Sequence, residues 1–156
     1  MKFCLKNRGL ELAVIAFCAW RAADLLDAWR HSPYDQWGWL SFLIWVIPAI
    51  FGLFNPITTS GNSTGFTIIA LGATVAGRLS DLNFLSYFAL AISMAGFVPS
   101  GARRIFWLVG ALAWMPALGW LANGFSAYLV LAIRLLLAMA AICPWLLARQ
   151  RTSCPS

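Results

Sequence analysis

Residues 124–147 read GFSAYLVLAIRLLLAMAAICPWLL, a continuous apolar run that contains one charge, Arg134. As an α-helix this run is about 36 Å long, enough to cross a hydrocarbon core of about 30 Å. Arg134 lies ten or more residues from either end of the run. A guanidinium at that depth costs about 3 kcal/mol unless it finds water or partners, so we expect Arg134 to face other helices and not lipid.

The composition of the whole chain indicates an integral membrane protein. Of its 156 residues, 62% are hydrophobic and 10% are charged, and the mean hydropathy is +0.79. This leaves too little polar surface for a soluble domain. The formal net charge is +6, but the basic residues are scattered between apolar runs, whereas a nucleic-acid-binding face would gather them. We therefore expect a lipid bilayer around the chain and no nucleic-acid partner.

Short polar connectors divide the chain into six apolar runs, which predict an all-α bundle of six transmembrane helices in a single domain over 1–156. The expected spans are 9–27, 38–54, 65–79, 82–98, 105–122 and 124–147. With the N-terminus inside, seven Lys and Arg lie on the cytoplasmic side and three on the opposite side. The positive-inside rule therefore predicts that both termini are cytoplasmic, in a bacterial-type inner membrane.

Three polar residues, Arg134, Glu11 and Asn123, are candidates for an intramembrane site. Glu11 lies in the first apolar run, three residues after Arg8. It can pair with Arg8 or Lys6 near the cytoplasmic surface, or it can be the buried partner of Arg134. Arg134 itself has either a structural role, held by backbone carbonyls and the Asn123 amide, or a functional role in an ion pathway.

A group of charged residues at steps of three follows the first apolar run: Arg21, Asp24, Asp27 and Arg30. Opposite charges at this spacing can pair along one helix. We interpret the group as an outer, interfacial charge cluster that lets the helix emerge into water, in preference to a proton or ion pathway.

The third expected span is short and carries four small residues, Gly72, Ala73, Ala76 and Gly77. They form two overlapping pairs of small residues four positions apart, 72/76 and 73/77. Such pairs let a neighbouring helix approach closely. We therefore expect a helix-packing face on this span.

The residue types that metal and nucleophile chemistry needs are few. Cys4, Cys18, Cys143 and Cys154 make no CxxC pair, and the chain has a single histidine, His31. A structural zinc or a Cys-His pair would need several of these residues at ligand spacing. We therefore expect no metal and no cofactor.

The order of elements resembles the membrane-embedded portion of the exosortase/archaeosortase family. The resemblance runs through SPYDQWGWLSFLIWVIPAI (32–50), the Gly-bearing third span and LNFLSYFALAISMAGFVPSGARRIFWLVGALAWMPALGWLANG (82–124). It implies processing of C-terminal sorting tails at the outer membrane face by a cysteine with arginine and histidine partners. Those motifs do not carry over, because Cys143 falls at the cytoplasmic end of the last span, Arg134 sits mid-span and no histidine follows either.

Three functional classes follow from these observations. The scarcity of chemical groups and the small-residue face favour a non-catalytic accessory or assembly subunit, packed against protein partners or a second copy of the chain. The first alternative is a small transporter or channel subunit that uses Arg134. The second alternative is an exosortase-like membrane protein.

Overall fold

The computed structural model describes residues 8–54, 63–116 and 124–152, which are all helical or lie in turns, without a β-strand. The all-α prediction is therefore confirmed for these residues. The elements are α1 (Gly9–Arg21), α2 (Asp24–His31), α3 (Gly38–Phe54), α4 (Ser63–Leu79), α5 (Asn83–Ala95), α6 (Ala102–Gly110), the 3₁₀ turn η3 (Ala111–Ala113) and α8 (Ala127–Thr152).

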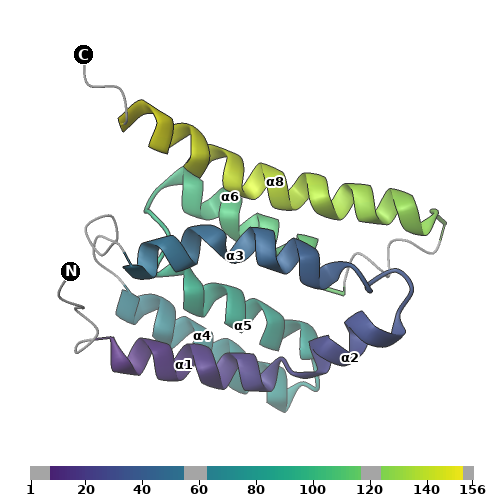
Figure 1. The fold of residues 1–156 in the computed structure, drawn as a ribbon. Helices are drawn as coiled ribbons and strands as arrows, with labels where there is room; N and C mark the ends of the chain where they lie inside the picture. The colour runs from purple at the N-terminus through teal and green to yellow at the C-terminus, as the bar shows by residue number, and fades with distance from the viewer. Residues whose placement is uncertain (1–7, 55–62, 117–123, 153–156) are drawn as a thin grey trace.

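The long helices run in alternating directions (Figure 1). Helices α1, α4 and α6 run one way, and α3, α5 and α8 run the other way, so α1 begins at the same end of the bundle as α8 ends. We name this end the Arg104 end, after a residue near the start of α6. The opposite end, where α2 and the connector from α2 to α3 lie, is the Asp35 end.

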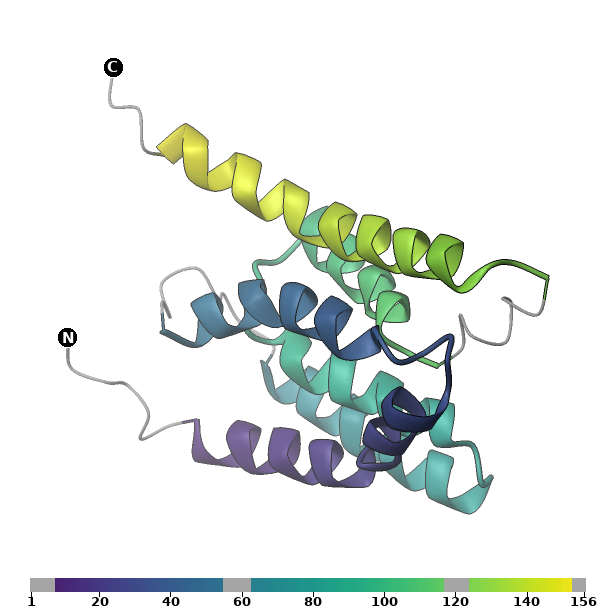
Figure 2. The ribbon, with the colours of Figure 1, turned by 45° about the vertical axis from the view of Figure 1, so that its right-hand side comes forward.

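The helices form three layers (Figures 1 and 2). Helix α8 is on one side and packs on α3, α6 and η3, whereas α1 and α4 are on the other side and pack on α5. Helices α3, α5 and α6 lie between. The buried core includes many small and aromatic side chains, for example Ala89, Ala91 and Ala95 of α5, Trp45 of α3 and Trp107 of α6.

Large aliphatic side chains face outward on helices of every layer. Leu10 of α1, Ile68 of α4, Ile105 of α6 and Leu136 of α8 are each 65% exposed or more, whereas Ser41, Thr74, Ser86, Ser93, Asp35 and Arg134 are buried. A soluble domain buries its large aliphatic side chains and exposes its polar ones. This bundle reverses that arrangement over much of its surface.

Five of the six expected spans have different boundaries in the structure, and only 38–54 is matched, by α3. Helix α4 begins at Ser63, two residues before the expected 65, and the expected span 82–98 is Asn83–Ala95 in the structure.

The span 9–27 is broken at 22–23, where α2 turns away from α1 (Figure 1). Two side chains of α2, Asp24 and Trp29, form hydrogen bonds with Tyr87 of α5 and with the carbonyl of Trp114, directly after η3. The span 105–122 begins earlier, at Ala102, and is α-helical only to Gly110, where η3 begins. Residues 117–123 lie outside the described part. The last helix begins at Ala127, three residues later than the expected Gly124, and continues to Thr152.

One described helix, Ala127–Leu146, is long and apolar enough to cross a membrane by itself, and only 28% of its apolar stretch is buried in the bundle. Three shorter apolar helices accompany it, Gly38–Phe54, Thr64–Leu79 and Asn83–Ala95. Helix length and hydropathy thus give weak support to membrane association. A six-span topology also requires the shorter helices to cross, and it stays a prediction.

Glycines allow α3 and α5 to come together at the Arg104 end. A Cβ added at Gly52 would run into the backbone carbonyl of Phe97, which follows α5, whereas a Cβ at Gly72 would meet nothing within 4 Å. We expect Gly52→Ala to lower the free energy of unfolding by about 1–3 kcal/mol, because backbone cannot move aside cheaply.

The matched control is Gly72→Ala, which should leave stability unchanged or raise it by up to about 1 kcal/mol, since alanine is the better helix former. Thermal unfolding of both variants in the same detergent measures the difference. Equal stability of the two variants would contradict the close packing of Gly52 on Phe97.

Candidate functional site

Arg134 is the centre of the most unusual polar arrangement in the described residues. It is the eighth residue of α8, about two turns from the start of the helix at the Asp35 end, and its exposed fraction is 0%. The sequence placed it at mid-membrane, ten residues from the end of its run. The later start of α8 brings it nearer the end of the bundle.

The guanidinium of Arg134 forms an ion pair with Asp35, through Nη2 and Oδ1. Asp35 lies in the connector between α2 and α3, and its side chain is 8% exposed. Its second oxygen, Oδ2, accepts a hydrogen bond of 2.8 Å from the Ser32 hydroxyl. Both carboxylate oxygens are therefore occupied, as a buried charge requires.

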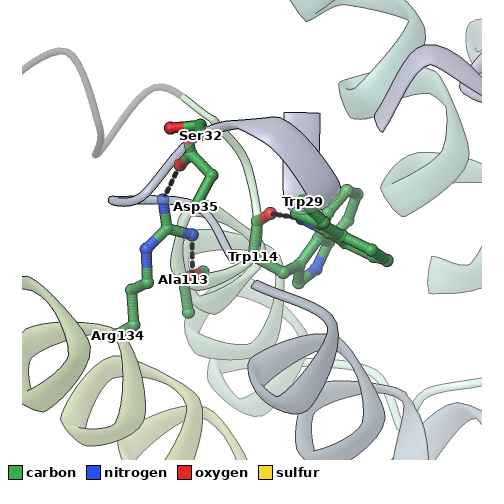
Figure 3. A network of polar contacts seen from close by, with 6 residues as sticks. All are labelled: Trp29, Ser32, Asp35, Ala113, Trp114 and Arg134. Atoms are coloured by element: carbon green, nitrogen blue, oxygen red, sulfur yellow. Dashed lines mark hydrogen bonds and ion pairs between the residues drawn. The ribbon is translucent and has the colours of Figure 1, made fainter. Parts of the chain in front are cut away.

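The end of the α6–η3 unit completes the site (Figure 3). Nη1 of Arg134 donates a 2.9 Å hydrogen bond to the carbonyl of Ala113, and the indole of Trp29 in α2 donates a 3.2 Å bond to the carbonyl of Trp114. Since regular α-helix stops at Gly110, these two carbonyls accept from side chains of other elements. The site thus joins α2, the α2–α3 connector, η3 and α8.

A second set of buried hydrogen bonds lies between α3 and α6. The rings of Trp45 and Trp107 stack with centroids 4.0 Å apart, and each indole N–H donates to the other residue's backbone carbonyl, at 2.7 and 2.8 Å. Phe42 and Trp114 extend this aromatic cluster toward the ion pair. Indole pairs of this kind bury a large apolar area and satisfy their polar atoms at once.

The structure does not bring together the three residues predicted for an intramembrane site. Glu11 lies in the first turn of α1, on the side of the bundle opposite α8, so it is not the partner of Arg134. Within the described residues Glu11 also forms no ion pair with Arg8, whose guanidinium lies 5.1 Å from the Phe97 ring centre. Asn123 and Lys6 lie outside the described residues.

The outer charge cluster is located at the Asp35 end, but its residues do not pair with one another. No ion pair joins Arg21, Asp24, Asp27 and Arg30, all of which the structure describes. The break between α1 and α2 separates Arg21 from the other three residues, which lie together on α2. Asp24 instead accepts a 2.9 Å hydrogen bond from the hydroxyl of Tyr87 in α5.

The two small-residue pairs of α4 point in different directions. Gly77 is buried, and a Cβ there would lie 3.0 Å from Leu85 and 3.2 Å from the carbonyl of Leu82; Ala73 packs on the core. Gly72 and Ala76 are exposed instead, and Gly72 has open space around it. The pair 73/77 thus serves packing within the chain, and the pair 72/76 faces outward.

Nothing in the described parts of the chain resembles a metal or nucleophile site. No group of three His, Cys, Asp or Glu is close enough to hold a metal ion within them. Cys143 is an exposed free thiol on α8, about 13 Å further along the helix axis than Arg134. His31 ends α2, and its ring bonds the Asp27 carbonyl. The residues named by the exosortase resemblance are thus not assembled.

Asp35 is the partner of Arg134 that the sequence interpretation missed. The signal for it was present, since each of the other acidic residues has an arginine three positions away: Arg8 for Glu11, Arg21 for Asp24, Arg30 for Asp27 and Arg78 for Asp81. Asp35 has no Lys or Arg three or four positions away. A carboxylate without a local partner is the natural candidate for a buried arginine without one.

Comparison of the chain with protein-family models, with curated proteins and with solved structures gives no match. The chemistry of the site therefore has to be inferred from its geometry alone. The Nη1 and Nη2 atoms of this buried arginine are bonded to a carbonyl and a carboxylate, whereas its Nε is buried without a hydrogen-bond partner among the described residues. The arrangement holds three segments of the chain in place.

We expect Arg134→Met to lower the free energy of unfolding by about 3–5 kcal/mol, because the Asp35 carboxylate is then buried without its counter-charge. Asp35→Leu should cost a similar amount. The double variant Arg134→Met/Asp35→Leu should be more stable than the sum of the two losses predicts.

Thermal unfolding in one detergent measures this double-mutant cycle. Arg78→Met serves as the control, since Arg78 is exposed and its loss should change stability by about 0.5 kcal/mol or less. Strictly additive losses in the cycle would show that the two side chains do not interact.

Proposed function

We propose that this chain is a non-catalytic integral membrane protein, with six membrane-spanning helical segments, that serves as a subunit of a larger membrane complex. The observation that carries the proposal is the reversed surface. Many outward-facing side chains on α1, α3, α4, α6 and α8 are large and apolar, whereas Ser41, Thr67, Thr74 and Arg134 of these helices are buried. Lipid tails suit such a surface, whereas water does not.

The ends of the bundle support this proposal through their charges. Arg8, Arg103 and Arg104 lie at the Arg104 end, together with the helical positions 149 and 151, and this end has no Asp. The Asp35 end has Arg21, Arg30 and Arg78 with all four Asp residues. By the positive-inside rule the Arg104 end is cytoplasmic, which agrees with cytoplasmic termini in a bacterial-type inner membrane.

A structural role for Arg134 fits its contacts better than transport does. A transport site must expose its charge to water or substrate at some stage. Arg134 is fully buried, its charge is compensated by Asp35, and breaking that pair separates α8 from the α2–α3 connector. For the same reason, burial and mutual pairing, we propose no catalytic role for Arg134 and Asp35.

The face available to a partner is the outward side of α4. Gly72 and Ala76 are exposed on α4, as are Ile68, Ile69 and Leu79, and a Cβ added at Gly72 would meet nothing within 4 Å. Small residues in such a position let another helix approach the α4 backbone and gain van der Waals contact that lipid chains do not provide. A partner subunit or a second copy of the chain would pack there.

The topology predicts opposite accessibility for two exposed serines. In a background whose four cysteines are replaced by alanine, Ser80→Cys places a thiol at the Asp35 end and Ser100→Cys places one at the Arg104 end. A membrane-impermeant maleimide added to intact spheroplasts should label Ser80→Cys and reach Ser100→Cys only after permeabilisation. Equal labelling of both before permeabilisation would refute the orientation.

The subunit role predicts a stoichiometric companion after mild purification from the native membrane. Gly72→Leu should weaken that association, because the added side chain fills the approach to α4, while stability stays unchanged. Ala132→Leu adds a similar volume on exposed α8 and should have no effect. Mass spectrometry of the purified material measures both, and a lone monomer from the unmodified chain would overturn the subunit role.

A further inference from the structure

A groove of about 310 Å³ opens between α1 and α4, on the side of the bundle opposite α8. Phe17 and Trp20 of α1 line it together with Val75 and Leu79 of α4. Its volume lies at the lower end of the range of small-molecule pockets, about 300–1,000 Å³. The groove is therefore large enough to hold part of an elongated apolar ligand.

The lining of the groove is mainly apolar. Besides the two arginines and the indole of the exposed Trp20, its polar residue is Thr74, whose hydroxyl donates a 2.8 Å bond to the carbonyl of Ala70. The sulfur of Cys18 lies 3.6 Å from the same hydroxyl. Because a polar group placed here would lose its water without gaining a partner, the portion of a ligand inside the groove has to be apolar.

The Asp35 end of the groove carries two arginines, Arg21 and Arg78, near the ends of α1 and α4. Neither forms an ion pair with a carboxylate in the described residues. The guanidinium of Arg21 lies 5.9 Å from the Trp20 ring centre. Asp24, the acidic residue nearest Arg21 in sequence, is bonded to Tyr87. Both arginines are thus without a direct ion-pair partner among the described residues, although Asp24, Asp27 and Asp81 lie at the same end of the bundle.

We propose that this groove binds one anionic phospholipid, with an acyl chain between α1 and α4 and the phosphate held by Arg21 and Arg78. Guanidinium groups bind phosphate oxygens through paired, charge-assisted hydrogen bonds. A phospholipid joins the apolar portion and the anionic portion in one molecule, at the depth where a helix end meets the headgroups. This inference rests on the proposed membrane location.

The test uses native mass spectrometry of the purified full chain with added phosphatidylglycerol or phosphatidylcholine of identical acyl chains. The unmodified protein should retain one phosphatidylglycerol in preference to phosphatidylcholine. In the double variant Arg21→Gln/Arg78→Gln, the ratio of bound phosphatidylglycerol to bound phosphatidylcholine should fall at least about tenfold, because each arginine contributes to the attraction of an anionic lipid. The control Arg30→Gln/Arg103→Gln removes the same charge from exposed positions elsewhere and should keep the preference.

A second variant tests the apolar part of the groove without changing its two arginines. Val75→Trp places a large ring in the groove at an exposed position and leaves both arginines in place. It should lose the bound phosphatidylglycerol although its thermal unfolding stays that of the unmodified protein. Retention of the lipid by Val75→Trp, or its displacement by inorganic phosphate alone, would overturn the proposal in favour of a simple anion site.

Failure of this proposal is distinguishable from failure of the proposed function. If alkaline carbonate releases the protein from membranes, the membrane location itself is wrong. If the protein stays embedded and the two double variants, Arg21→Gln/Arg78→Gln and Arg30→Gln/Arg103→Gln, have the same preference for phosphatidylglycerol, only the lipid site is wrong.

Discussion

A guanidinium that has no route to water must find its acceptors within the protein, and the arrangement of this bundle at one end follows from that constraint. Arg134 donates hydrogen bonds to the Asp35 carboxylate and to the Ala113 carbonyl. Asp35 is in turn held by Ser32. The connector from α2 to α3 and the end of the α6–η3 unit must therefore meet α8 at one point. A pair of this kind adds little net stability but makes the alternative packings costly, because each would leave a buried charge alone.

The tryptophans join the helices through hydrogen bonds from their indole N–H groups to backbone carbonyls. Trp45 and Trp107 satisfy each other's backbone carbonyls, and Trp29 satisfies that of Trp114. In the proposed membrane location, lipid chains compete with aliphatic side chains, and hydrophobic burial then gives little preference for one helix partner over another. Hydrogen bonds between indoles and carbonyls, stacked rings and glycines such as Gly52 supply that preference. The contacts that define the three layers are thus polar, aromatic or sterically close.

The two sides of the bundle differ in what they offer to other molecules. The α8 side is aliphatic along its outer face and, at the Arg134 site, closed by side chains of the chain itself. The α1–α4 side has a groove with two arginines at one end, and an outward pair of small residues on α4. Both features concern the surroundings of the protein, and in the part of the chain that the structure describes no group of three His, Cys, Asp or Glu could hold a metal ion.

The sequence by itself determined that the chain is helical, where α3 begins and ends, and that Arg134 needs partners inside the protein. Hydropathy and turn residues are local, so they are readable without a fold. It did not determine the break between α1 and α2, the early end of α6, or Asp35 as the partner of Arg134. Those depend on contacts between residues 35 and 134 or 29 and 114, and only the packed structure brings such distant groups together. Local pairing at three-residue spacing was the wrong guide for Asp24 because Tyr87, far along the chain, provides a hydrogen bond that the broken helix makes accessible.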